Sequence, residues 1–198
     1  NKMEKECSDK IIILGASGIV GRYLFEVFKK AGNPVIGTYN KNEKKELIYF
    51  DVLDSSIDDL DIEGAKYAII CSAMVGVDNC KKNPDYSRKI NVNGIKRLIK
   101  EFSEKKIIPV YISSVFVFNG EGDYKEEDFR NPINEYGEQK KDVEDFIIEN
   151  IKEYLIIRLG RVFGVNKNEG MFADALEKYK GGEEILCNDY EEFSLTYS

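Results

Sequence analysis

Aliphatic runs alternate along the chain with segments whose apolar residues recur at helical spacing. The run at 10–14 (KIIIL) is typical of a strand buried on both faces of a parallel sheet. The segment at 17–32 places its apolar residues on one helical face and ends at Gly32. The same patterns predict strands at 34–39, 46–52, 66–73, 107–118 and 154–160, and helices at 83–106 and 134–151. This alternation implies right-handed crossovers, so the pattern predicts an α/β fold with a doubly wound parallel sheet and helices on both faces.

A glycine-rich turn, GASGIVG, joins the first predicted strand to the first helix and places Gly15, Gly18 and Gly21 three residues apart. Glycines let a backbone approach a ligand closely, and the free N–H groups and dipole of a helix N-terminus attract a pyrophosphate. In this position the motif predicts a dinucleotide site in a Rossmann-type sheet. A tight turn without a ligand is the alternative.

Residues after the second and third strands indicate which nucleotide is bound. Asn40 stands where NAD-preferring sites often carry an acid, and Arg22 and Lys41 lie close enough in sequence to meet a 2′-phosphate. We therefore predict NADP(H), with NAD(H) as the alternative. Asp51, at the end of the third strand, is placed either to bind the adenine amino group or to cap a helix.

Composition limits the chemistry further. The 198 residues are 42% hydrophobic, which suits a globular domain with a sizeable core, and the net charge of −7 disfavours a nucleic-acid partner. The chain has no histidine, which excludes His-dependent triads and His-ligated metals and leaves proton transfer to Tyr, Lys, Asp, Glu or Cys. No C-x-x-C spacing occurs, so the cysteines are interpreted as free thiols, with redox sensing as the alternative: Cys7, Cys71, Cys80 and Cys187.

Neither a signal peptide nor a membrane span is predicted. The N-terminal NKMEKECSDK has no apolar core, and no apolar stretch approaches about 18 residues. We expect a cytoplasmic protein with no membrane partner.

Tyr136 and Lys140 lie one turn apart on the same face of the predicted helix 134–151. Both residue types are common in this chain, so the pair alone does not distinguish a catalytic site from a solvated surface. The motifs around the pair favour a catalytic site. In order they are GASGIVG, FDVLD, CSAMVGVDNCKKNP, INVNG, YISSVFVFNG and DYKEEDFRNPINEYGEQK. Together they resemble the extended short-chain dehydrogenase/reductase family, and within it the dTDP-4-dehydrorhamnose reductase branch, which includes the regulatory β subunit of methionine adenosyltransferase.

The resemblance implies a catalytic set of Ser114, Tyr136 and Lys140 and no metal. Tyr136 would protonate the nascent alkoxide, Lys140 would hold the nicotinamide ribose, and Ser114 would bind the substrate oxygen, although simple strand-end hydrogen bonding is an alternative for Ser114. The Lys140 ammonium together with an oxidised nicotinamide is expected to lower the tyrosine pKa by about 1–3 units. The cofactor-binding residues implied are Gly15, Ser17, Gly18, Ile19, Val20, Gly21, Arg22, Asn40, Asp51, Val52, Ser72, Ala73, Met74, Asn91, Tyr136 and Lys140.

Several positions depart from the branch. Val115 and Phe116 stand where the branch has Asp and Tyr, and Arg161 stands where it often has Trp. Phe129 and Leu195 each replace a usual proline. We expect residues 1–165 to form the NAD(P)-binding domain and 166–198 to begin a small substrate-binding lobe that is incomplete in this chain.

These observations predict an NADP(H)-dependent reductase of a keto group on a nucleotide-linked deoxysugar, such as a dTDP-4-keto-6-deoxyhexose. The partner would be a small-molecule nucleotide sugar, with a homodimer or a partner enzyme as further candidates. Val115, Phe116 and the short C-terminus favour the alternative, a non-catalytic NAD(P)-binding regulatory subunit. An epimerase or dehydratase is disfavoured, because Val115 removes an acid that elimination could use.

Overall fold

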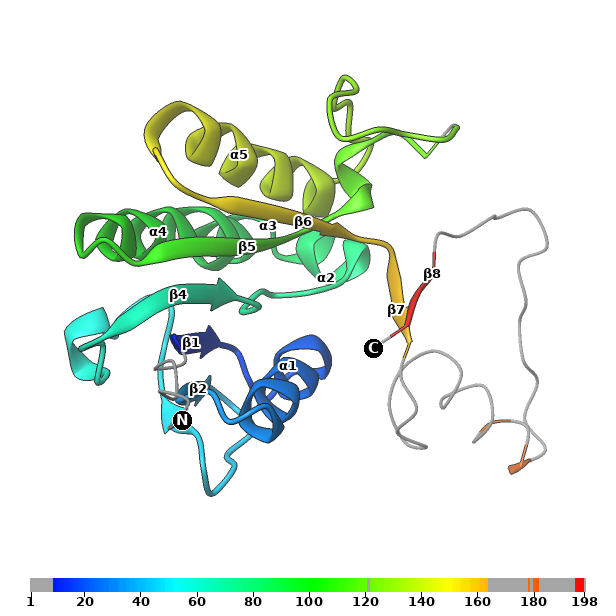
Figure 1. The fold of residues 1–198 in the computed structure, drawn as a ribbon. Coiled ribbons are helices and arrows are strands. Elements are labelled where there is room, and N and C mark those ends of the chain that lie inside the picture. The colour runs from blue at the N-terminus through cyan, green and yellow to red at the C-terminus, as the bar shows by residue number, and fades with distance from the viewer. Residues whose placement is uncertain (1–8, 121, 164–177, 179, 182–194, 198) are drawn as a thin grey trace, which may run out of the picture. The chain divides into compact units, whose positions relative to one another are not determined.

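The computed structural model describes residues 9–120, 122–163, 178, 180–181 and 195–197 (Figure 1). The chain divides into two compact units, Asn1–Arg158 and Leu159–Ser198. Of the sequence expectations, Cys7, Cys187 and most of 166–198 lie outside the described residues, as do the side chains of Arg161 and Leu195.

A six-stranded sheet of order β3-β2-β1-β4-β5-β6 forms the centre of the fold. The pairings of β1 with β2 and β4, of β2 with β3, and of β4 with β5 are all parallel. This order confirms the predicted Rossmann-type sheet. The strands are β1 Lys10–Leu14, β2 Val35–Tyr39, β3 Ile48–Tyr49, β4 Ala65–Ile70, β5 Ile108–Ser114 and β6 Leu155–Leu159.

Helices cover both faces of the sheet, because alternate residues of the central strands point to opposite sides. Ile12 and Leu14 of β1 belong to a core packed by α4 (Ile95–Glu104) and α5 (Glu135–Asn150), which Figure 1 shows together on one side of the sheet. Ile11 and Ile13 belong to a second core, packed by α1 (Ile19–Lys30). The two cores hold the carboxyl ends of the strands in place, where Rossmann-type sheets bind their ligands.

The predicted helix at 83–106 is continuous but not uniform. It consists of α3 (Pro84–Arg88), a π-helical turn η2 (Lys89–Gly94) and α4. A short helix that the sequence analysis did not predict, α2 (Val77–Lys82), precedes it. Two short 3₁₀ turns, η1 (Ile57–Asp59) and η3 (Val115–Val117), complete the described helical elements of the first unit.

The third strand is much shorter than the predicted 46–52. Only Ile48 and Tyr49 pair with β2, and both are exposed at the edge of the sheet. Phe50 and Val52, which the pattern assigned to the strand, instead enter the core on the α4 side. The Phe50 N–H still donates to the Tyr39 carbonyl at 2.8 Å, and the strand pairing goes no further.

The second unit contains one described sheet. In it β7 (Arg161–Phe163) pairs in parallel with β8 (Leu195–Tyr197), with Val162 opposite Thr196. Across the described residues, no helix has both the length and the apolar composition needed to cross a bilayer.

Candidate active site

The first and third glycines of the turn are required by the fold itself. Gly15 has φ +82°, and a Cβ there would lie 2.9 Å from the Ser72 backbone nitrogen. At Gly21 a Cβ would lie 2.3 Å from the Gly15 carbonyl oxygen. Gly18 differs, because its Cβ would meet only that same oxygen, at 3.4 Å. Protein packing therefore explains Gly15 and Gly21, whereas Gly18 leaves an open approach to the backbone.

This open approach leads to the N-terminus of α1. Gly18 is the N-cap, no side chain caps the helix, and its first turn carries no acid. The first N–H groups of the helix thus keep their capacity to bind an anion, and the helix dipole adds to the attraction. Ser17, Ile19 and Val20 flank the turn and are half-buried. The described residues fit the diphosphate of a dinucleotide.

Two predicted cofactor residues meet at the ends of β2 and β3. The Asn40 side-chain amide donates to Asp51 Oδ2 (3.0 Å), and Asp51 Oδ1 accepts from the Leu53 backbone N–H (2.8 Å). Asp51 therefore closes a turn, while Ser56 caps the helical turn η1. The helix-cap alternative for Asp51 is wrong, and adenine binding by Asp51 stays a prediction.

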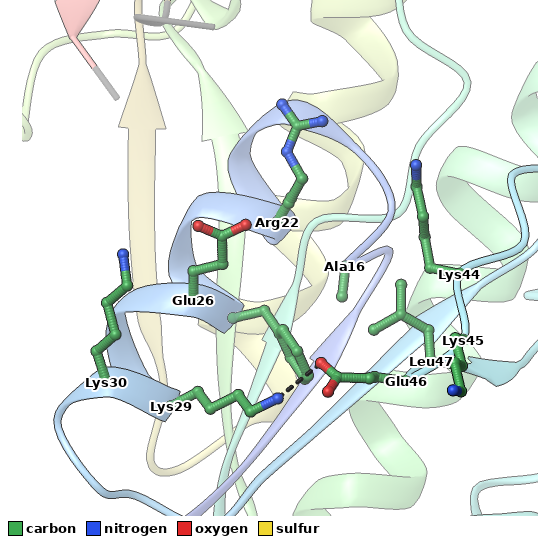
Figure 2. A pocket seen from close by; sticks show the side chains of 10 residues that line it. Ala16, Arg22, Glu26, Lys29, Lys30, Lys44, Lys45, Glu46 and Leu47 are labelled. Carbon is green, nitrogen blue, oxygen red and sulfur yellow. Dashed lines mark hydrogen bonds and ion pairs between the residues drawn. The ribbon is translucent and has the colours of Figure 1, made fainter.

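A pocket of about 520 Å³ lies between α1 and the segment that precedes β3 (Figure 2). Ala16, Phe25 and Leu47 contribute apolar surface, and Lys29 pairs with Glu46 at 2.7 Å within the lining. Figure 2 shows Arg22 and Lys44 with their charged ends directed to the same side of the view. The lining includes Lys44 rather than Lys41, the cation that sequence proximity suggested. The full lining is Ala16, Arg22, Phe25, Glu26, Lys29, Lys30, Lys44, Lys45, Glu46 and Leu47.

The loop after β4, Ser72–Ala73–Met74, is held from beneath by Asn91. The Asn91 Oδ1 accepts from the Met74 N–H (2.7 Å), and its Nδ2 donates to the Met74 carbonyl (2.9 Å). Asn91 is buried and also donates to Gln139 Oε1 at 2.7 Å. Its observed role is to hold the loop that contacts the glycine turn; direct contact of these residues with a nucleotide stays a prediction.

Ser114, Tyr136 and Lys140 come together from β5 and α5. Helix α5 approaches the chain after β5 so closely that a Cβ on Gly137 would lie 2.1 Å from the Phe116 carbonyl oxygen. The rings of Phe116 and Tyr136 pack edge to face with centroids 6.1 Å apart. Lys140 Nζ lies 5.6 Å from the centroid of the Tyr136 ring. The predicted catalytic residues therefore share one neighbourhood at the carboxyl end of the sheet.

Lys140 is a buried amine, only 5% exposed. Its Nζ donates to the Ile112 carbonyl at 2.8 Å and lies 4.7 Å from the centroid of the Tyr111 ring. Burial lowers the pKa of Lys140 to about 8, although the neighbouring Cys71, Glu144 and Cys80 act in the opposite direction. The lysine is thus still largely protonated near neutral pH.

Burial raises the pKa of Tyr136, whereas the lowering expected above assumed Lys140 together with an oxidised nicotinamide. Burial brings this pKa to about 12, and the Cys80 thiol adds to the shift. Desolvation of the phenolate is the largest cause of this shift. Tyr136 is therefore held as a neutral phenol. The lowering expected from Lys140 together with an oxidised nicotinamide stays a prediction.

Ser114 is buried at the end of β5, where its Oγ accepts from the Phe116 N–H at 3.3 Å. The strand-end hydrogen bond expected as an alternative is therefore present. Ser114 retains its own O–H as a donor, so this bond leaves a role toward a substrate oxygen open.

Several residues around the site were not identified from the sequence. Gly137 is needed for the contact with Phe116, and a glycine inside a predicted helix was the available signal. Gln139 is fully buried and donates to Ser87 Oγ (2.7 Å) and Glu135 Oε1 (2.9 Å). Glu144 is equally buried. A polar residue on a charged helix carries no mark of burial in the sequence, so neither Gln139 nor Glu144 was predictable.

The two described cysteines are free thiols, as expected. Burial raises the pKa of Cys71 to about 12 and also raises that of Cys80. Both thiols are consequently protonated and poorly nucleophilic, which disfavours redox sensing at these positions.

The sheet order and the open glycine turn define a Rossmann-type dinucleotide-binding protein. The model of the family described as RmlD substrate binding domain matches residues 9–189, and the chain belongs to this family of extended short-chain dehydrogenases/reductases.

Curated relatives carry two kinds of name. The chain is 30% identical over 159 residues to the probable low-salt glycan biosynthesis reductase Agl14 of Haloferax volcanii, covering 77% of this chain and 53% of that protein. It is 28% identical over 158 residues to methionine adenosyltransferase 2 subunit beta of Bos taurus, covering 78% and 47%. The chain thus spans about half the length of the curated relatives it matches.

Solved structures of similar fold include two reductases. One is a hypothetical dTDP-4-dehydrorhamnose reductase from Sulfolobus tokodaii, with TM-score 0.78, 31% identity, and coverage of 89% of this chain and 63% of that one. The other is the dTDP-4-dehydrorhamnose reductase of Bacillus anthracis in complex with NADP, with TM-score 0.75, 26% identity, and coverage of 89% and 61%.

Proposed function

We propose that the protein is an NADP(H)-dependent reductase of a keto group on a nucleotide-linked deoxysugar. The observation that carries the proposal is the convergence of Ser114, Tyr136 and the buried Lys140 at the carboxyl end of the sheet that also presents the open glycine turn. A protein that only binds a nucleotide has little physical need for all three of these residues. The reductase names among the relatives and similar structures support the same reaction class.

The protonation states of the site suit reduction. A bound nicotinamide nucleotide supplies the hydride. Tyr136, with a pKa of about 12, carries its proton near neutral pH and is a suitable donor to an alkoxide formed at the former keto carbon. Lys140, with a pKa of about 8, is still largely cationic there and stabilises the phenolate that Tyr136 leaves behind. Ser114 donates a hydrogen bond to the substrate oxygen and orients it.

We assign the nucleotide site to the glycine turn Gly15–Arg22 and the loop Ser72–Met74, with Asn40 and Asp51 at the adenosine end. The preference for NADP(H) rests on Arg22 and Lys44, which line one pocket beside the turn, and on Asn40, which offers no carboxylate to a ribose diol. The NADP complex of the Bacillus anthracis reductase supports this preference. Residues 166–198 are proposed to begin the substrate-binding lobe. The two free thiols agree with a cytoplasmic location.

Cofactor binding and turnover test the proposal in one design. We expect NADPH to bind at least about tenfold more tightly than NADH, and NADPH to be oxidised in the presence of dTDP- or UDP-linked 4-ketosugars but not of simple ketones. Absence of nucleotide binding would overturn the assignment of the glycine turn. Equal affinity for NADH would overturn the cofactor preference alone.

A second candidate function is a nucleotide-binding regulatory subunit of a partner enzyme. Phe116, beside Tyr136, is 40% exposed, and Val115 adds no polar group near Ser114. The similarity to methionine adenosyltransferase 2 subunit beta favours this reading. Tight NADPH binding without turnover of any sugar in the panel, together with co-purification of a larger enzyme, would select it over the reductase.

A further inference from the structure

Glu144 is an unusual residue for the interior of a protein, because it is an acid with a fully buried side chain. It lies one turn after Lys140 on α5 and receives hydrogen bonds from three residues on three other segments. Ser113 Oγ donates to Oε1 at 2.5 Å, and Arg130 donates to Oε2 at 3.0 Å. Arg158 donates from Nε at 3.0 Å and from its terminal nitrogen at 2.8 Å.

Two of the three donors belong to parts of the chain next to proposed active-site residues, and the third lies in the edge strand of the sheet. Ser113 is the neighbour of Ser114 at the end of β5. Arg130 lies in the segment 122–134, which leads directly into the turn of α5 that carries Tyr136. Arg158 is in the edge strand β6.

The two arginines also tie the segment 122–134 to its neighbours through contacts that do not involve Glu144. Arg158 contacts the segment from β6, and Arg130, which lies in the segment, contacts α5. Arg158 donates to the Glu126 carbonyl at 2.8 Å and packs 5.1 Å from the centroid of the Phe118 ring. Arg130 forms a second ion pair with Asp145 at 2.6 Å. The segment 122–134 contains no helix or strand in its described structure, so side-chain contacts hold it in place, including those of the two arginines and the stacking of Tyr124 on Phe118.

We propose that Glu144 is a positioning residue: its carboxylate, clamped by Arg130 and Arg158, holds the Ser113–Ser114 strand end and the segment 122–134 at a fixed distance from Tyr136 and Lys140. The kinetic part of this inference rests on the proposed reductase activity; the structural part does not. Both arginines are mostly buried, with side chains 18% and 16% exposed. Loss of the carboxylate charge leaves two confined cations without their common counter-charge. Arg130 keeps Asp145, whereas Arg158 keeps only the Glu126 carbonyl and the Phe118 ring as partners described here.

The central test is Glu144→Gln, which preserves the shape of the side chain and removes its charge. We expect backbone hydrogen exchange in 122–130 and in β6 to accelerate by about tenfold or more, while exchange in β1 and α4 is unchanged. We expect kcat to fall by about 10- to 100-fold, while the affinity for NADPH, which depends on Lys140 as well as on the glycine turn, should change much less. The matched control is Asp142→Asn on the same helix, which removes a more exposed ion pair with Arg88 (2.6 Å) and should leave every readout unchanged.

Two further variants keep the inference testable if Glu144→Gln does not fold. Arg158→Lys retains the charge but not the paired donors, and Arg130→Met leaves Glu144 with its Arg158 partner. We expect both to accelerate exchange in 122–130, with Arg158→Lys also affecting β6. Unchanged exchange there in a folded variant would overturn the proposal, as would a uniform acceleration across the sheet, which indicates a role in stability alone. If the wild-type protein binds NADPH but turns over no sugar, the reductase fails and the exchange pattern still decides the role of Glu144.

Discussion

The candidate site has two ends, the glycine turn and the neighbourhood of Tyr136 and Lys140. The first is formed mainly by backbone atoms and the second by buried side chains. At the glycine turn, Gly15 and Gly21 let backbone segments approach each other so closely that no side chain fits between them. The N-terminus of α1 beside the turn has no side-chain cap. At the other end the work is done by buried side chains, with Lys140 against the Ile112 carbonyl and Glu144 between two arginines. Backbone dipoles do not titrate, whereas the buried amine and phenol do.

This difference separates binding from reactivity. A turn made of backbone binds its ligand with the same strength over a wide pH range and is sensitive mainly to added volume. A site made of buried titratable groups is sensitive to pH and is maintained at a cost in folding stability, because each group is removed from water. The substitutions below are chosen to affect one end and leave the other intact.

The largest effect is expected from Tyr136→Phe. This change removes the proton donor and keeps the ring that packs on Phe116, so turnover should fall by about 10²–10⁴-fold while NADPH affinity changes far less. Steady-state kinetics and a fluorescence titration with NADPH measure the two quantities. Tyr154→Phe, at an exposed position before β6, is the control. Full turnover in Tyr136→Phe would refute the assigned chemistry.

A paired substitution at the other end distinguishes packing from ligand binding. Gly21→Ala places a Cβ 2.3 Å from the Gly15 oxygen and should lower the free energy of unfolding by about 1–3 kcal/mol. Gly18→Ala meets nothing closer than 3.4 Å, so it should cost less than about 1 kcal/mol yet weaken NADPH binding by about tenfold. Urea unfolding and nucleotide titration provide the measurements. If Gly18→Ala bound NADPH as tightly as the wild type, the open approach at this glycine would not be a nucleotide site.

The substitution Lys140→Met tests how much the buried amine lowers the free energy of unfolding, and how this effect depends on pH. The folded-state pKa of about 8 lies below the ordinary lysine value of about 10.4, so the unfolded chain binds more protons between these limits. The contribution of Lys140 is therefore most unfavourable below about pH 8, and stability recovers as the pH rises toward about 10. Lys140→Met should raise the free energy of unfolding by about 1–2 kcal/mol near neutral pH, after the loss of the bond to the Ile112 carbonyl is subtracted.

The gain in Lys140→Met should shrink as unfolding is repeated at increasing pH up to about 9.5, because the wild-type lysine then loses its proton. Lys141→Met, one residue along the same helix and paired with Asp145 at 2.9 Å, serves as the control and should show no such trend. A gain in Lys140→Met that is independent of pH would contradict the role of burial in lowering this pKa.

The smallest effect is expected at the pocket beside the glycine turn. Lys29 and Glu46 form an ion pair of 2.7 Å with side chains 53% and 63% exposed. Lys29→Gln should leave the midpoint of thermal unfolding almost unchanged, and added salt should reduce any difference further. Thermal unfolding at two salt concentrations measures this midpoint. A large, salt-sensitive drop in the midpoint would show that this end also relies on side-chain electrostatics.

The periodicity of apolar residues predicted the order of the strands and helices because burial on a sheet or a helix leaves a repeating pattern. It failed where a single tertiary contact decided the outcome. The strand predicted at 46–52 stops at Tyr49, while Phe50 and Val52 are buried in the core, and the pocket beside α1 is lined by Lys44 instead of Lys41.

The residues that carry the proposed chemistry were identifiable from their spacing and motif context, but their electrostatic states were not. Tyr136 and Lys140 are placed on one face by the helical period. Burial raises the pKa of Tyr136 and lowers the pKa of Lys140. This burial depends on tertiary packing, including the close approach of α5 to the chain after β5, which Gly137 permits.

By itself, the sequence determined the doubly wound sheet, the glycine turn at the start of α1 and the helical face shared by Tyr136 and Lys140, because each is encoded by residues near one another in the chain. Only the tertiary structure decided which polar groups are removed from water. The burial of Lys140 and the clamp on Glu144 arise from segments far apart in the chain, such as Ser113 and Glu144, which are 31 residues apart, and desolvation depends on all of these segments at once.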